Sequence, residues 1–185
     1  NVGGVTSSPT CTALAWTATL NVSGVADGAS VAVTADHTDA AGNSATQAST
    51  TVVKDASLPT ITITSSPIIN AANATAYIVS GACSENTRTV SVNVGGVTST
   101  PTCTALAWSA TLNVTAVGDS ASVSITANHS DAAGNAATQA STTVLKDTLI
   151  PTVTITSSPV INNVNATAYI ISGACSENTR TVSVN

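Results

Sequence analysis

Apolar and polar residues alternate along several short segments of the chain, which is the pattern of half-buried β-strands. The clearest is residues 60–64, where Ile61 and Ile63 share one face. Similar alternation predicts further strands at 76–81, 89–94, 108–114, 123–127 and 140–145. Six or seven short strands in about 90 residues predict an antiparallel β-sandwich.

The whole pattern returns after 92 residues. NVGGVTSSPTCTALAW at 1–16 is followed by NVGGVTSTPTCTALAW at 93–108, and GACSENTRTVSVN at 81–93 returns at 173–185. Roughly 72 of 92 aligned positions are identical, so we expect one fold used repeatedly. The chain begins and ends at the same phase of the repeat, which suggests a segment of a longer array. We expect its partners to be neighbouring identical repeats, in the same or an adjacent chain.

Two linkers divide the chain. The segments KDASLPT at 54–60 and KDTLIPT at 146–152 each place a proline just before an alternating run, where the missing proline donor is tolerated. We therefore expect the C-terminal part of a repeat at 1–58, a complete repeat at 59–148 and the N-terminal part of the next at 149–185. An alternative is a short subunit whose partial domains complete one another head to tail.

Composition supports strands and excludes several partners. Only 7% of residues are charged and 2% are aromatic, and the chain has no Phe or Met. Thr, Val, Ala and Ser dominate, and helix-forming residues are scarce, so we do not expect a helical protein. With a net charge of -5 and four basic residues, the chain is not expected to bind nucleic acid. No run of eighteen apolar residues occurs, so we expect no membrane insertion.

A repeat of about 90 residues with DAAGN, a strand, a Lys-Asp linker and PTVTITS resembles the bacterial immunoglobulin-like repeats of large surface adhesins and biofilm proteins. The resemblance covers the whole chain. The family usually carries Val-Asp-Thr at the linker, whereas here Lys54 and Lys146 precede Asp55 and Asp147. The resemblance implies tandem immunoglobulin-like β-sandwiches that form a rigid, extracellular stalk or surface fibre. The alternative function is a self-assembling extracellular filament or matrix subunit.

Two cysteines per repeat in a small β-domain predict a disulfide and an oxidising, extracellular compartment. The domain boundaries pair Cys83 with Cys103 and leave Cys11 and Cys175 to pair outside this segment. A bridge between chains and free buried thiols are the alternatives. Zinc is disfavoured because no CxxC spacing occurs.

Calcium is the one cofactor that the sequence suggests. Carboxylates near the linkers are the hard oxygen ligands that calcium takes, and the candidates are Asp36, Asp39, Asp55, Asp131 and Asp147. The alternative is that Asp39 and Asp131 cap turns, with Gly42 and Gly134 supplying positive φ.

The remaining residues are expected to be structural. Trp16 and Trp108 fall on inward faces and are predicted core residues. His37 and Asp39 lie near serines, but no nucleophile elbow or oxyanion loop accompanies them, so we expect no enzyme. Lys54 and Lys146 are expected at an exposed boundary, in weak pairs with Asp55 or another acid; an amide crosslink to Asn is the alternative. Candidate glycosylation sequons begin at Asn21, Asn73, Asn113, Asn128 and Asn165.

Overall fold

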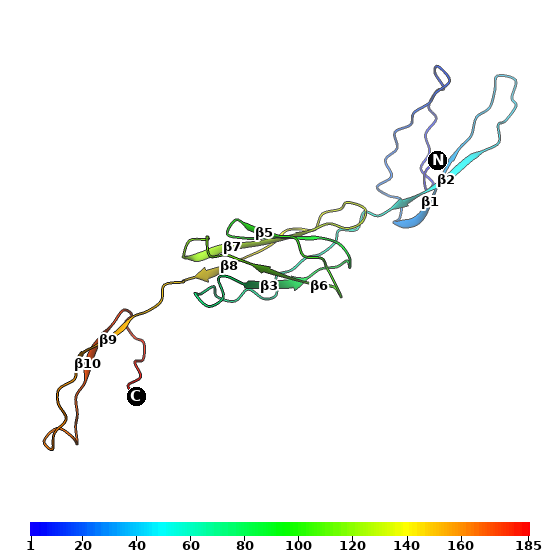
Figure 1. Cartoon of the computed structure of the whole chain (residues 1–185). Helices are drawn as coiled ribbons and strands as arrows, with labels where there is room; N and C mark the ends of the chain where they lie inside the picture. The colour runs from blue at the N-terminus through cyan, green and yellow to red at the C-terminus, as the bar shows by residue number, and fades with distance from the viewer.

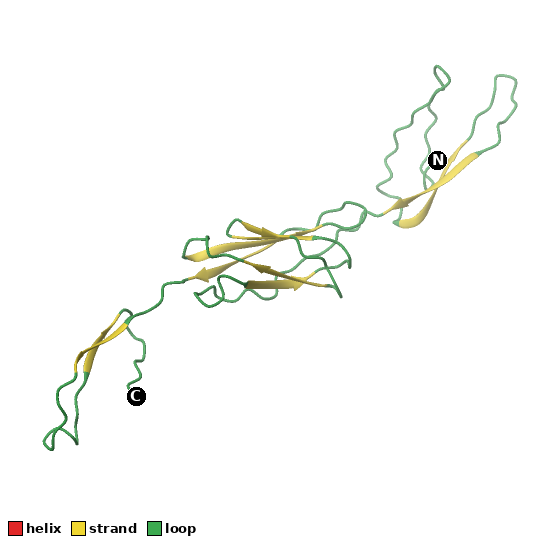
Figure 2. Cartoon of the chain, viewed as in Figure 1, coloured by secondary structure: helices red, strands yellow, loops and turns green.

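The computed structural model describes all residues from 1 to 185, and every regular element in it is a β-strand (Figure 2). The strands are β1 (Gly28–Ala35), β2 (Ala48–Lys54), β3 (Tyr77–Ala82), β4 (Val90–Val94), β5 (Val97–Ser99), β6 (Ala107–Leu112), β7 (Ser120–His129), β8 (Ala140–Lys146), β9 (Val153–Ser157) and β10 (Ser172–Cys175). All strand pairs are antiparallel. The all-β, antiparallel prediction is confirmed. The chain contains no helix with the length and apolar character needed to span a membrane.

The central part of the chain is a two-layer sandwich. One layer is the β3–β6 pair, and the other is a four-stranded sheet in the order β5-β4-β7-β8 (Figure 1). All 18 buried hydrophobic residues of the core lie between Ile61 and Val144. The immunoglobulin-like arrangement of these strands stays a prediction.

Alternation explains how the two layers share this core. In β6, Trp108, Ala110 and Leu112 are buried while the residues between them are exposed. In β4, every second residue from Val90 to Val94 is buried. Because successive side chains of a strand point to opposite faces, each strand contributes one row to the core. The observed strands therefore lie close to the predicted segments.

The segment predicted as a strand at 60–64 is an exception, because in the complete repeat it makes only single bridge pairs along β3. Thr62 N donates to Ala82 O at 3.0 Å, but Thr62 O accepts a hydrogen bond from the Trp108 indole at 3.1 Å instead of from a strand. The indole N–H thus takes the place of the backbone N–H that a neighbouring strand would donate to Thr62 O. Gly81 makes the approach possible, since a Cβ there would lie 1.8 Å from Thr62 O.

The two flanking parts are incomplete. β1 pairs with β2 on one side of the sandwich, and β9 pairs with β10 on the other, so three parts follow one another in an extended row (Figure 1). Trp108 is 3% exposed and lies in the core, under the segment 60–82, whereas its equivalent Trp16 is 57% exposed in the part of the repeat described at 1–58. The core position of Trp16 in a complete repeat stays a prediction.

Candidate functional site: the junction between repeats

The linker after β2 is held by the preceding part of the chain through Asp27. Lys54 Nζ lies 2.6 Å from Asp27 Oδ1, and Ala56 N and Ser57 Oγ donate to Asp27 Oδ2 at 3.0 and 3.1 Å. The hydrogen bond from Lys54, followed by that from Ala56 N, lowers the pKa of Asp27 to about 2. One carboxylate therefore binds three groups of the linker.

The same linker is also held by the sandwich that follows it. Asn135 Nδ2 donates to the carbonyl oxygen of Asp55 at 3.1 Å. Thr60 N donates to Ser84 Oγ at 2.9 Å, and Ser84 N donates to Thr60 O at 3.1 Å. The linker is thus hydrogen-bonded to the parts of the chain on both of its sides.

The second junction repeats the lysine–aspartate contact and also the threonine–serine contact, in which Thr152 N donates to Ser176 Oγ at 2.8 Å. Lys146 Nζ lies 2.8 Å from Asp119 Oδ1, and Thr148 N donates to Asp119 Oδ2 at 3.1 Å. The expectation that Lys146 is exposed is wrong, because its side chain is only 2% exposed. Lys146 is the last residue of β8, and it pairs with Ser120 at the start of β7. Asp119, the residue before β7, therefore lies beside the lysine side chain. Both lysines pair with Asp and not with Asn.

Sequence reasoning missed Asp27 and Asp119. The signal that could have found them is their position, 27 residues before the lysine in both repeats. The acid and the base keep the same sequence separation in both repeats, and they lie at the ends of two adjacent strands. Such a pair is a candidate for an ion pair between those strands.

The DAAGN loop at 131–135 is built around a buried carboxylate. Asn135 N and Nδ2 donate to the two oxygens of Asp131, each at 2.7 Å, and Gly134 adopts φ 96°. Burial raises the pKa of Asp131, but the hydrogen bonds from Asn135 and the loop amides outweigh it, so the net pKa is below the usual value. Arg88 Nη2 donates to Asp131 O at 2.9 Å. The loop is therefore fixed where its Asn135 reaches the linker.

The equivalent loop at 39–43 has the same turn. Asn43 Nδ2 donates to Asp39 Oδ2, and Asn43 N and Ala41 N donate to Oδ1, at 2.8 to 2.9 Å. The hydrogen bonds from Asn43 lower the pKa of Asp39. Gly42 has φ 91°. Both loops thus have the turn-capping geometry.

The five candidate calcium ligands are not gathered into one site. Asp36 accepts hydrogen bonds from Gln47 at 2.9 and 3.2 Å, while Asp55 and Asp147 each accept one from the amide two residues later at 3.0 Å. No group of three or more His, Cys, Asp or Glu side chains in the chain is close enough to hold a metal ion. Calcium takes six to eight oxygen ligands, so these dispersed carboxylates do not fit it.

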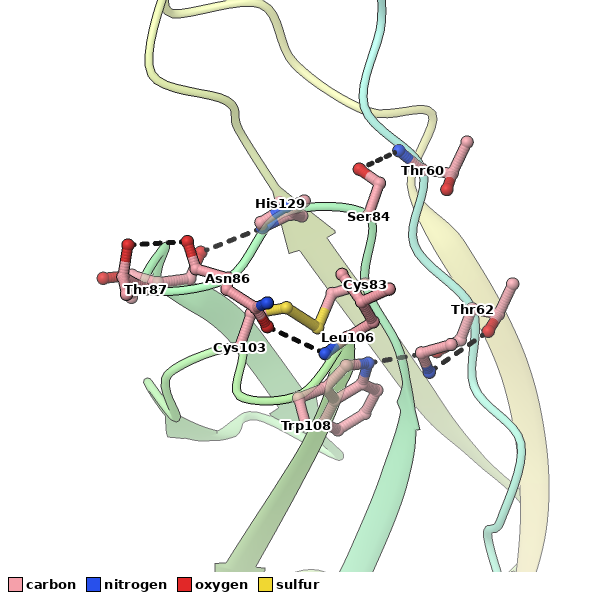
Figure 3. The surroundings of a disulfide bond; sticks show 12 residues. Thr60, Thr62, Cys83, Ser84, Asn86, Thr87, Cys103, Leu106, Trp108 and His129 are labelled. Carbon is pink, nitrogen blue, oxygen red and sulfur yellow. Dashed lines mark hydrogen bonds between the residues drawn. A yellow bond between two sulfur atoms is a disulfide. The ribbon is translucent and has the colours of Figure 1, made fainter.

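A disulfide lies at the end of the sandwich that adjoins the linker at 54–60. It joins Cys83 to Cys103, whose Cα atoms are 6.1 Å apart. Figure 3 shows it near the Thr60–Ser84 contact and the Trp108 indole. Asn86 Oδ1, beside it, accepts a hydrogen bond from Leu106 N at 2.8 Å. Cys11 and Cys175 are free and exposed.

The candidate glycosylation residues differ in how their amides are used. Asn73 and Asn165 each donate Nδ2 to a backbone carbonyl at 2.9 Å, which occupies the nitrogen that a glycan would need. Asn21 and Asn113 use only Oδ1, as acceptors for an amide two residues later, and Asn128 accepts from Gln139. Glycosylation stays a prediction, and the last three are its better sites.

The chain is similar to three solved structures of bacterial adhesion proteins. A Ca2+-stabilised adhesin with which an Antarctic bacterium binds ice shares 28% identity over 80% of this chain, with a TM-score of 0.48. A 1.5-MDa bacterial ice-binding adhesin shares 27% over 65%, with a TM-score of 0.43. A tetra-tandem repeat from the extending region of a large adhesion protein shares 23% over 84%, with a TM-score of 0.46. The matches span 40%, 43% and 40% of those chains.

No family model matches the chain, and no curated protein matches it in sequence. The three solved structures are adhesion proteins, the class that the sequence resembles, and the third is a tandem repeat. With TM-scores below 0.5, they carry no argument about the role of this chain.

Proposed function

We propose that the chain is a segment of an extracellular adhesin stalk in which 92-residue repeats act as rigid spacers. The observation that carries this proposal is the linker at 54–60, which is hydrogen-bonded to Asp27 on one side and by Asn135 on the other. A linker fixed on both sides transmits the direction of one module to the next, whereas a free linker of the same length would act as a hinge.

The polar residues support a mechanical and not an enzymatic role. Asp27, Asp119 and Asp131 are engaged in holding strands, linkers and loops. The Cys83–Cys103 disulfide suits a module exposed to an oxidising exterior. The extracellular location and the immunoglobulin-like class follow from the sequence resemblance and belong to this proposal.

Small-angle X-ray scattering tests rigidity on a chain extended by a copy of residues 59–92 before Asn1 and a copy of residues 94–148 after Asn185, so that every module is complete. We expect the wild-type profile to fit one elongated shape. Asp27→Ala should free the linker and give a shorter, broader distribution of end-to-end distances. Asp36→Ala is the matched control, because it removes the same charge from a carboxylate that binds only Gln47. A wild-type profile that already fits a flexible string of modules would overturn the spacer role.

A further inference from the structure

A hollow lies in the complete repeat between the start of β4 and the end of β7. The ladder between these two strands ends at the pair Val90↔His129. The residues beyond it, Thr89 and Ser130, form their bridges with other segments and not with each other. The space left between them has a volume of about 420 Å³.

Every residue that lines the hollow is polar. The seven include three exposed hydroxyl residues, Thr89, Ser91 and Ser130, and none carries a carboxylate. His129 also belongs to the lining, but its Nε2 is buried and therefore closed to a ligand. The hollow is thus surrounded by hydrogen-bonding groups and contains no acid that would repel an anion.

Arg88 brings to the hollow a positive charge that no carboxylate of the chain pairs with. The other three basic side chains each form an ion pair, with Asp27, Asp119 or Glu177. The guanidinium group of Arg88 makes one hydrogen bond, from Nη2 to the carbonyl oxygen of Asp131 at 2.9 Å. Its unpartnered nitrogens are not buried, so they remain open to a ligand.

The amide of Asn128 is oriented by a neighbouring side chain. Gln139 Nε2 donates to Asn128 Oδ1 at 3.0 Å, so the acceptor end of this amide is occupied. The donor end, Nδ2, has no partner in the chain. Because Asn128 lies opposite Ser91 in the ladder, an amide donor and a hydroxyl stand next to each other in the hollow.

The backbone beside the arginine is strained and fixed. Thr87 has φ 65°, a region that β-branched residues rarely adopt. Thr87 N donates to Cys103 O, and Cys103 N donates to Arg88 O, both at 2.8 Å. Figure 3 shows this turn beside the disulfide. Strained residues gather at ligand sites, and a site that is already fixed loses little entropy when a ligand binds.

We propose that this hollow binds an oxyanion, to which the Arg88 guanidinium and Asn128 Nδ2 donate. A guanidinium group matches the oxygens of such anions with two parallel hydrogen bonds. The volume of the hollow is in the range of small-molecule sites, so it also has room for a sugar that carries the anionic group. The ring hydroxyls of that sugar would face the hydroxyl residues of the lining. This inference goes beyond the spacer role and does not rest on it.

The first copy of the repeat differs at one of the two donors. Asp36 stands where the second copy has Asn128, and it accepts from Gln47 as Asn128 accepts from Gln139. A carboxylate at this position replaces a donor with a negative charge and repels an anion. We therefore expect binding by repeats that carry Asn here and not by repeats that carry Asp.

The test is a titration of the isotope-labelled full chain with sodium sulfate, glucose 6-sulfate and glucose at constant ionic strength, followed by NMR. We expect both sulfates to shift the side-chain signals of Arg88 and Asn128, and glucose to shift neither. Tighter binding of glucose 6-sulfate than of sulfate would assign the anionic group to a sugar, and affinity no tighter than that of sulfate would assign a free ion. Arg88→Gln should weaken sulfate binding about tenfold or more, because it removes the charge-assisted hydrogen bonds.

The matched control is Arg180→Gln, which removes the same charge from the same sequence, CSENTRTVS, outside the hollow. It should leave the affinity unchanged. Asn128→Asp should abolish binding and still fold, since the first copy carries Asp with the same glutamine contact. A wild-type chain whose signals do not respond to either sulfate would overturn the proposal. Unchanged affinity in a folded Arg88→Gln or Asn128→Asp variant would do the same.

Discussion

Lys146 Nζ and Asp119 Oδ1 lie 2.8 Å apart, but the lysine side chain is 2% exposed and the aspartate side chain is 42% exposed. The pair is therefore asymmetric: the cation depends on this partner, while the carboxylate also meets water and accepts from Thr148 N and Oγ1. A charged group that loses its partner destabilises the folded state more when it is more deeply buried.

This asymmetry predicts different losses for the two single substitutions. Asp119→Ala should lower the free energy of unfolding of the complete repeat more than Lys146→Met, because only the first leaves a buried charge unpaired. Urea unfolding followed by Trp108 fluorescence measures both, in the Trp16→Phe background. Equal losses, or a larger loss from Lys146→Met, would show that solvent reaches the ammonium group.

Gly81 is predicted to be the least replaceable glycine of the sandwich. A Cβ there would lie 1.8 Å from Thr62 O and 2.7 Å from Trp108 Nε1, and both atoms are fixed by their mutual hydrogen bond. We expect Gly81→Ala to destabilise the repeat by about 2 kcal/mol or more, by the overpacking of a rigid site.

The control is Gly118→Ala, because nothing lies within 4 Å of the added Cβ. It should change the unfolding midpoint little. If both substitutions have equal small effects, residues 60–64 can move away from β3, and the indole contact does not fix them.

Alternation predicted most of this fold because each repeat is small and its strands are buried on one face only. β4, β6, β7 and β8 all lie close to the predicted segments, since each carries a row of apolar residues into the same core. The segment 60–64 alternates as clearly, yet it is no regular strand in the complete repeat. The competing partner is an indole from β6, which no local pattern reveals.

The junction was harder to read from sequence. Asp27 and Asp119 sit among small polar residues and have no local pattern, and their role depends on which strands end side by side. The sequence identifies the carboxylates near the linkers, but it does not show what they bind. In the structure, Asp39, Asp55 and Asp147 accept short-range hydrogen bonds from backbone amides. Sequence spacing alone does not distinguish a turn cap from a cation ligand.

Acid is predicted to destabilise the complete repeat through Asp119 and Asp131. Both have a pKa below the usual 3.8: for Asp119 the hydrogen bond from Lys146 is the largest cause, and for Asp131 hydrogen bonds outweigh burial. The unfolded carboxylates take up protons near pH 3.8, before the folded ones do. The unfolded state therefore binds more protons there, so stability is fully present above this pH and falls as pH drops through the folded values.

Thermal unfolding between pH 6 and pH 2 checks this dependence. Asp131→Asn should give a flatter profile than the wild type, because one of the two groups is gone. Asp36→Asn, outside the complete repeat, should keep the wild-type slope. A profile that is unchanged by Asp131→Asn would mean that this carboxylate has the same proton affinity in the folded and unfolded chain.

Chelation is predicted to leave the complete repeat as stable as before. Stabilisation by a ligand requires a site that exists in the folded state, and here the candidate carboxylates of the chain are dispersed and hydrogen-bonded to amides or to Gln47. Differential scanning calorimetry in EDTA, compared with EDTA already saturated with calcium, should give the same midpoint. A midpoint that falls in EDTA and returns with excess calcium would show that oxygen ligands beyond these carboxylates, such as loop carbonyls near Asp131, assemble a site when the ion is present. In that case Asp131→Asn should abolish the calcium response, while Asp36→Asn should keep it.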